Sequence, residues 1–131
     1  MKFLMKIKYK IQYFFLQRKY QKNFGNKQNP LLCGEKERGL GKTTIVIKDA
    51  AKRKLPIIVD NQVMKHNILD MAIRMNLNVV CFAVSDNIRG TPFKFFLIDG
   101  TYHTYKYCID NGMVIMNGFV LLTKDKKVED D

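Results

Sequence analysis

The sequence predicts an α/β fold with a mainly parallel sheet of about five strands flanked by helices. Short apolar runs typical of strands alternate along the chain with segments whose apolar residues recur at helical spacing. A chain of 131 residues fits one domain with one core. An apolar share of 47% with 27% charged residues is typical of a soluble globular protein. We therefore expect a packed domain rather than a disordered or fibrous chain.

The expected strands are short apolar runs bounded by Gly, Pro, Asp or Asn, at residues 31–33, 55–59, 79–84, 95–98 and 119–123. The run at 79–84 is apolar throughout, which is typical of a strand covered on both faces. Helices are expected at 43–54, 64–75 and 101–111. Because each helix connects two strands, parallel pairing is favoured.

The apolar residues of the first 28 positions fit two periodicities, one typical of a helix and one typical of a strand. Leu4, Ile7, Ile11 and Phe14 recur at three- and four-residue spacing, which gathers them on one face of a helix. Residues 6–13 also alternate between polar and apolar, as in a half-buried strand. We favour the helix because the apolar spacing continues beyond residue 13. The turn-forming residues at 23–30 then predict a linker, which divides the chain into a basic amphipathic segment, 1–28, and a domain, 29–131.

The formal net charge of +11 is concentrated in segment 1–28, which has eight Lys or Arg and no Asp or Glu. Such a block attracts polyanions, and we expect nucleic acid ahead of a membrane surface; a solvated arm without a partner is the alternative. No apolar run approaches the ~18 residues of a membrane span. Lysines interrupt the apolar start, unlike a signal peptide. We expect a cytoplasmic protein, in the host cytoplasm if the chain is viral, and an oligomer is compatible with the sequence.

Three cysteines are widely spaced and form no C-x-x-C pair, so neither a disulfide framework nor a zinc site is expected. His103, Cys108 and Cys81 are the nearest to a set of soft metal ligands, and we interpret them as core and loop residues. His66 is interpreted as a surface helix residue.

One stretch points to phosphate chemistry, because a glycine-rich loop lies between an expected strand and an expected helix. It reads Glu37-Arg38-Gly39-Leu40-Gly41-Lys42-Thr43-Thr44. Glycines allow backbone N–H groups to turn toward an anion, and the following helix adds its free amides and positive dipole end. Lys42 would then reach the β and γ phosphates, and the Thr43 hydroxyl would ligate Mg²⁺.

This stretch resembles the P-loop NTPases, and more narrowly the small phage-type ATPases whose loop reads G-E-R-G-x-G-K-T. The general pattern G-x-x-x-x-G-K-[ST] places its first Gly at position 36, where this chain has Lys36, and Gly34 lies two residues earlier. The resemblance covers most of residues 31–123. It implies that residues 37–44 bind ATP or GTP with Mg²⁺, and that Lys42 acts in catalysis.

The resemblance also implies an acidic residue at the end of an apolar strand, where it holds Mg²⁺. The run ending at Asp99 has that form. In the hydrolytic members a Glu follows this Asp and polarises the attacking water, whereas this chain has Gly100. We therefore expect slow or undetectable hydrolysis, which Gly100→Glu would raise. Asp60, which follows the expected strand at 55–59, and Asp110 are the candidate replacements.

Two further positions resemble the phage-type group. Arg89 precedes the acidic strand and is placed to approach phosphates, and Thr123 ends the last strand where related folds sense the γ phosphate. A surface turn and an ordinary strand Thr are the alternative interpretations.

Two function classes remain open at this point. One is a P-loop ATPase that acts in nucleic-acid handling. Its resemblance to phage-type ATPases implies a viral origin. The other is a non-hydrolysing nucleotide-binding module that uses segment 1–28 to hold nucleic acid or a partner protein. A nucleotide kinase is disfavoured, since 131 residues leave little room for a lid and an acceptor site.

Overall fold

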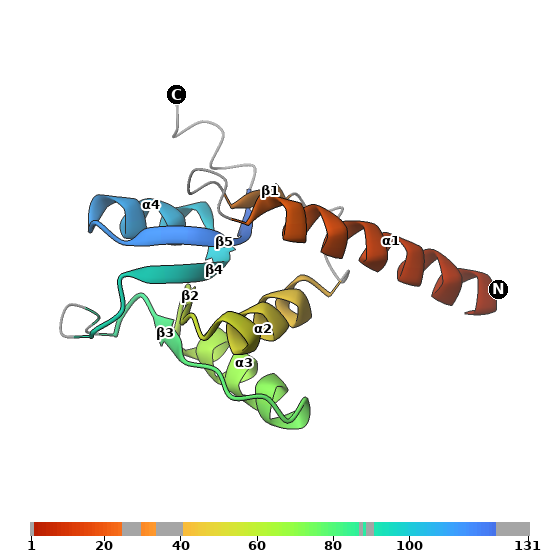
Figure 1. Cartoon of the computed structure of the whole chain (residues 1–131), viewed down its shortest axis with the longest axis horizontal. Helices are drawn as coiled ribbons and strands as arrows, with labels where there is room; N and C mark the ends of the chain where they lie inside the picture. The colour runs from red at the N-terminus through yellow and green to blue at the C-terminus, as the bar shows by residue number, and fades with distance from the viewer. Residues whose placement is uncertain (1, 25–29, 34–40, 87, 89–90, 123–131) are drawn as a thin grey trace.

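Helices and strands alternate along the chain in the computed structural model, which describes residues 2–24, 30–33, 41–86, 88 and 91–122 (Figure 1). The helices are α1 (Lys2–Asn23), α2 (Lys42–Arg53), α3 (Gln62–Arg74) and α4 (Tyr102–Asp110). The strands are β1 (Leu31–Cys33), β2 (Ile57–Val59), β3 (Cys81–Ala83), β4 (Phe95–Thr101) and β5 (Val114–Leu121).

The strands form one sheet in the order β1-β5-β4-β2-β3, and every neighbouring pair is parallel. The predicted α/β class with a parallel sheet is thus confirmed. Because all the strands run in one direction, their carboxyl ends lie at the same edge of the sheet. Gly118 in β5 has a φ of +140°, and a side chain there would collide with the Ile98 carbonyl of β4. This close approach of two central strands requires glycine.

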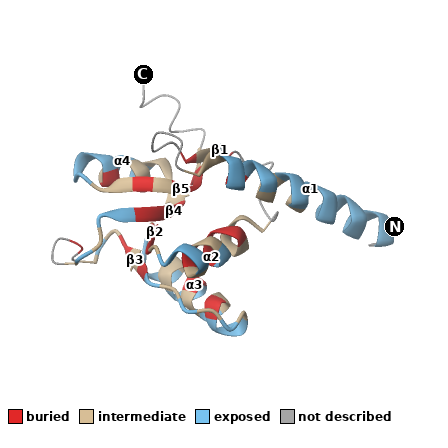
Figure 2. Cartoon of the chain, viewed as in Figure 1, coloured by how far each residue is buried: buried red, intermediate tan, exposed pale blue. Residues whose placement is uncertain are grey.

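The strands alternate their side chains between two apolar layers, which are red in the burial view (Figure 2). Ile57 and Val59 of β2 pack with buried residues of α2 and α3 on one face of the sheet. Ile58 between them packs with Phe96 and with Cys108 of α4 on the opposite face. Helices on both faces explain why the strands read as continuous apolar runs.

Three strand predictions differ from the structure. The run at 79–84 forms only the short β3 at the sheet edge, and Val80 before it is exposed. The predicted coverage of both faces is confirmed for the strand itself, because Cys81 and Ala83 pack in one apolar layer and Phe82 packs against the other. The last strand begins at Val114, because its pairing with β4 begins there. β4 continues beyond Ile98 to Thr101, so Asp99 lies inside the paired strand. An apolar run does not report where pairing starts or stops.

The N-terminal segment is helical, as predicted, and its last turns pack on the sheet. Tyr20 is buried, and its ring stacks on Phe119 of β5 with centroids 5.3 Å apart. Its hydroxyl donates to Asp49 of α2 at 2.7 Å. The Asn117 side chain of β5 donates to the Tyr20 carbonyl and accepts from the Asn23 side chain, both at 2.8 Å. These bonds anchor α1, while residues 3–12 are exposed and project from the body (Figure 2).

Within the described residues, no helix combines the length and the apolar character needed to cross a bilayer.

Candidate functional site

The predicted site residues that the structure describes meet at the carboxyl edge of the sheet. There a cavity of about 440 Å³ is lined by the start of α2 and by the ends of β2, β4 and β5. Ligands of open parallel sheets bind in this position. The lining includes six of the predicted site residues, namely Gly41, Lys42, Thr43, Thr44, Asp60 and Asp99, together with Gly100.

The first turn of α2 presents backbone donors and a positive charge to this cavity. Gly41, which precedes the helix, has a φ of +85°, and as a glycine it supplies no side chain to cap the helix start. Intrahelical bonding begins with the Ile45 N–H, which donates to the Gly41 carbonyl at 3.1 Å. The preceding amides therefore have no partner within the helix, and no acidic residue stands in the first turn. This end of the helix suits an anion, and Lys42 adds its ammonium group.

Thr43 and Asp99 join the start of α2 to β4. The Thr43 hydroxyl donates a hydrogen bond of 2.8 Å to Oδ2 of Asp99, across 56 residues of sequence. Asp99 is buried, with only 8% of its surface exposed. Two oxygen groups are thus held together beside the helix N-terminus, at the mouth of the cavity.

Burial raises the pKa of Asp99 above the ordinary value for an aspartic acid. The Thr43 hydrogen bond and the charge of Lys42 act in the opposite direction, whereas the nearby carboxyl of Asp60 raises the pKa further. A carboxylate in this setting is short of compensating positive charge. A cation bound beside it would supply that charge and hold the group ionised.

Asp60 follows β2 and lies beside Asp99 in the cavity lining. Its Oδ1 accepts from the backbone N–H of Thr101 at 2.9 Å, from the Thr101 hydroxyl at 3.1 Å and from the Thr104 hydroxyl. All three donors come from the junction between β4 and α4. These three hydrogen bonds hold Oδ1 in place. Among the described residues, none donates a hydrogen bond to Oδ2.

Gly100 makes room for this carboxyl group. A Cβ at position 100 would lie 2.6 Å from Oδ1 of Asp60 and 3.5 Å from Cβ of Thr104. The place that the resemblance assigns to Glu is thus filled by the side chain of Asp60. A Glu at position 100 would therefore have to displace the Asp60 carboxyl group, so Gly100→Glu would not leave the rest of the site unchanged.

Helix α1 also reaches the N-terminal end of α2, which sequence reasoning missed. A Cβ at Gly41 would lie 2.7 Å from the ring of Tyr13 and 3.2 Å from the hydroxyl of Tyr9. The Lys48 ammonium lies 5.9 Å from the centre of the Tyr13 ring. The helical period of segment 1–28 gave the only available signal, because it places Tyr9 and Tyr13 on one face.

The remaining predicted site residues are Asp110 and six that the structure does not describe. Glu37, Arg38, Gly39 and Leu40, and likewise Arg89 and Thr123, lie outside the described residues. Asp110 is exposed at the end of α4 and is not part of the lining.

Cys81 and Cys108 belong to different apolar layers of the sheet, in agreement with their interpretation as core residues. Burial raises the pKa of each thiol to about 12, which disfavours the thiolate that a metal requires.

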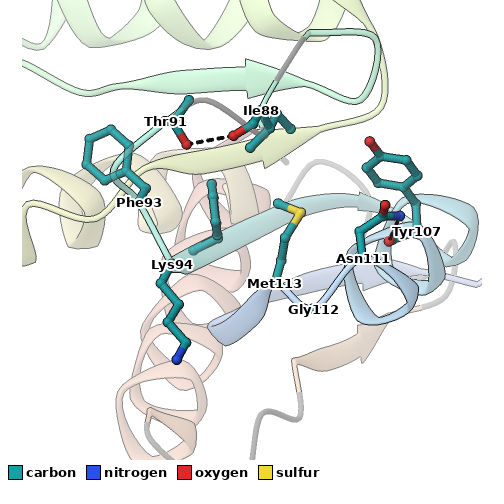
Figure 3. Close-up of a pocket in the computed structure, with 9 residues that line it drawn as sticks. Ile88, Thr91, Phe93, Lys94, Tyr107, Asn111, Gly112 and Met113 are labelled. Carbon is teal, nitrogen blue, oxygen red and sulfur yellow. Dashed lines mark hydrogen bonds between the residues drawn. The ribbon is translucent and has the colours of Figure 1, made fainter.

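A second cavity, of about 270 Å³, lies near the amino ends of β4 and β5 (Figure 3). Lys94 is the only charged side chain among the described residues that line it. Two of its polar side chains already bond to the chain: Thr91 donates to the Ile88 carbonyl at 2.9 Å, and Asn111 donates to the Tyr107 carbonyl at 2.8 Å (Figure 3). The cavity at the carboxyl edge therefore offers the richer chemistry.

Comparison of the chain with protein-family models, curated proteins and solved structures found no match. The candidate site thus rests on the residues and geometry described above.

Proposed function

We propose that the protein binds a nucleoside triphosphate together with Mg²⁺ in the cavity at the carboxyl edge of the sheet. The hydrogen bond between Thr43 and Asp99 carries this proposal. It joins a helix-start hydroxyl to a buried carboxylate, beside Lys42 and the first turn of α2. Both residues were singled out from the sequence as ligands of one metal ion, although 56 positions separate them.

The phosphates have a clear place in this arrangement. The amides at the start of α2 would donate to the β phosphate, and the Lys42 ammonium would offset the charge on the β and γ phosphates. Residues 37–40 would complete the wrapping, as the resemblance implies. ATP and GTP fit these contacts equally, since every one of them is made to phosphate.

The side chains also suit Mg²⁺. This ion prefers oxygen ligands and keeps several waters, so one or two protein groups and the phosphates suffice. Thr43 and Asp99 supply a hydroxyl and a carboxylate. Among the described residues no cluster of three or more His, Cys, Asp or Glu side chains that could hold a metal is found. A site shared with phosphate needs no such cluster.

For hydrolysis, Asp60 is the residue that we propose as the base that orients the attacking water. It is the second carboxylate in the lining, and Oδ1 is fixed by three donors from the β4–α4 junction. Fixing one oxygen orients the other. Because an Asp side chain is shorter than Glu, we expect slow turnover. A non-hydrolysing module is the second candidate, favoured by the glycine at position 100.

The cytoplasm is the proposed place of action, because Mg²⁺ and nucleoside triphosphates are available there. The three cysteines are buried, which also suits a reducing compartment.

Lys42→Ala tests the binding proposal. The variant should lose at least about tenfold in affinity for ATP, since the motif places only this charged side chain at the terminal phosphates. Calorimetric titration with ATP and with GTP, each with and without Mg²⁺, measures the loss. Lys52→Ala, an exposed lysine in the last turn of the same helix, is the matched control and should bind as the wild type does.

Phosphate release from the same samples separates the two candidates. Slow release that disappears in Asp60→Asn supports hydrolysis, whereas tight binding without release supports the non-hydrolysing module. Equal ATP affinity of folded Lys42→Ala and wild type would overturn the nucleotide site itself.

A further inference from the structure

The outward side of α1 carries an apolar face that no described part of the chain covers. Its six members are exposed and lie in the first four turns, where they project from the body (Figure 2). At 3.6 residues per turn they occupy about one third of the helix circumference. We call them the α1 stripe: Phe3, Leu4, Ile7, Ile11, Phe14 and Phe15.

The stripe lies opposite the side of α1 that packs on the protein. Tyr13, Leu16 and Tyr20 face the body, where they pack with the core. The helical period turns the stripe to the other side. Phe3 is 72% exposed, Leu4 67% and Phe15 63%, although each is a large apolar side chain. An exposed contiguous apolar surface of this kind marks an interaction site.

Positive charge borders the stripe. Helix α1 has seven Lys or Arg and no Asp or Glu. Lys10 lies along one border of the stripe, and Lys8 and Lys19 lie along the other. Arg18 and Lys22 continue its line toward the body, and the Arg18 guanidinium lies 5.7 Å from the centre of the Phe14 ring. A binding partner of the α1 stripe must therefore accept apolar side chains at the centre of the contact and cations at its edges.

We propose that α1 docks on an anionic phospholipid surface, with the stripe inserted among the acyl chains and the bordering lysines at the headgroups. A bilayer surface meets both requirements, because its apolar interior lies a few ångströms below its negative charge. Nucleic acid would pair with the basic side chains only, and it would leave the six apolar residues against phosphate and water. The charge of α1 disfavours a second copy of the same helix as the occupant. We therefore propose the lipid surface ahead of the nucleic acid that charge alone suggested.

Docking requires no rearrangement of the fold. The anchor formed by Tyr20, Asn23 and Asn117 lies on the body side, and the stripe faces away from it. The proposal is independent of the nucleotide site, so Lys42→Ala should bind vesicles as the wild type does.

Vesicle sedimentation provides the first test, with vesicles of phosphatidylcholine alone and of phosphatidylcholine with phosphatidylserine. The wild type should sediment with the anionic vesicles. Leu4→Gln/Ile11→Gln/Phe15→Gln should lose at least about tenfold in partitioning. Lys8→Gln/Lys10→Gln should lose about fivefold for each lysine at low salt. Val63→Gln/Ile73→Gln is the matched control, since both residues are exposed apolar residues of α3.

A fluorescence measurement reports insertion directly, because the natural sequence contains no Trp. Phe15→Trp should show blue-shifted emission with anionic vesicles and quenching by brominated acyl chains. Val63→Trp should show neither. Circular dichroism of each variant checks that the helices persist.

Three outcomes would overturn the proposal. The first is no binding of the wild type to anionic vesicles, and the second is equal binding by the stripe variant. The third is retention on duplex or single-stranded DNA with a steep salt dependence while vesicles remain unbound, which would assign α1 to nucleic acid. Self-association abolished by the stripe variant, without vesicle binding, would likewise overturn it and assign the face to a second copy.

Discussion

Asp99 is a buried carboxyl group whose ionisation opposes folding. Burial raises its pKa in the folded protein above the value of about 4 in an unfolded chain. A carboxyl group that holds its proton more tightly when folded stabilises the fold below pH ~4, and this contribution is lost as the pH rises. At neutral pH the ionised group is a cost that a bound cation would relieve.

Asp99→Asn should therefore increase stability and weaken metal-dependent binding together. Without nucleotide or Mg²⁺ at pH 7, we expect the melting temperature to rise by about 2–5 °C, with the difference fading as the pH falls below ~4. Calorimetry over this pH range measures the effect. In ATP titrations, the Mg²⁺-dependent part of the affinity should fall more than the Mg²⁺-free part.

A destabilised Asp99→Asn variant at pH 7 would mean that the Thr43 hydrogen bond outweighs the cost of burying the charge. Equal loss of both parts of the ATP affinity would make Asp99 structural rather than a metal ligand. Thr43→Ser, which keeps the hydroxyl, is the control and should retain the Mg²⁺ effect.

Gly100 and Asp60 are coupled by close contact, and a double-mutant cycle measures that coupling. Gly100→Ala should cost about 1–3 kcal/mol, because its Cβ would lie 2.6 Å from Oδ1 of Asp60. The same change made in Asp60→Ala should cost clearly less, since the colliding oxygen is gone. Urea unfolding of the four proteins provides the energies. Equal costs in both backgrounds would contradict the close approach.

This contact also shows where sequence reasoning on the site ends. Gly39 to Thr44 and the run before Asp99 carry local patterns, so the pairing of Thr43 with Asp99 was predictable. That Asp60 fills the place beside Gly100 depends on which strand neighbours β4 and on the short β4–α4 junction. The residues adjacent to Gly100 in the sequence do not indicate which strand pairs with β4.

Helix α1 buries the hydroxyl groups of two tyrosines, Tyr13 and Tyr20, which differ in their hydrogen bonding. The Tyr20 hydroxyl donates to Asp49, and burial with this carboxylate nearby raises the pKa of Tyr20 above its ordinary value. The Tyr13 hydroxyl is buried without a hydrogen-bond partner among the described residues.

Removing the two hydroxyls should therefore have different effects. Tyr20→Phe should lower the free energy of unfolding by about 1–2 kcal/mol, because the Asp49 carboxylate loses its donor. Tyr13→Phe should be neutral or slightly stabilising, since its hydroxyl is desolvated without compensation. Chemical denaturation of both variants is the measurement. The reverse order of stabilities would contradict these contacts.

At the level of elements, helix and strand positions were largely predictable because they depend on local period and on Gly and Pro. Strand neighbours were not. Residues 79–84 are as apolar as an inner strand, yet β3 lies at the edge, because the order β1-β5-β4-β2-β3 is set by how helices cross the sheet. The early start of β5 at Val114 likewise follows from its partner Phe95 and not from its own sequence.

For the whole molecule, the division into segment 1–28 and domain 29–131 stays a prediction. The contacts of Tyr20 with Phe119 and Asp49 cross this boundary. Deletion of residues 1–28 should lower the free energy of unfolding by about 3–5 kcal/mol, the usual effect of losing a buried aromatic residue. Urea unfolding tests this, and an unchanged stability would support a separate arm.

The anchor at Asn117 has a consequence for the direction in which α1 points. Apolar surfaces slide and rotate over one another at little cost, whereas hydrogen bonds between particular atoms do not. The carboxamide of Asn117 bonds to the Tyr20 carbonyl, to Asn23 and to the backbone N–H of Gly118. A rotation of α1 by one residue, about 100°, would break the first two of these bonds and turn part of its outer apolar surface inward. Helix α1 therefore keeps one orientation relative to the carboxyl edge of the sheet, so a partner bound to its outer face would meet that edge at one constant angle.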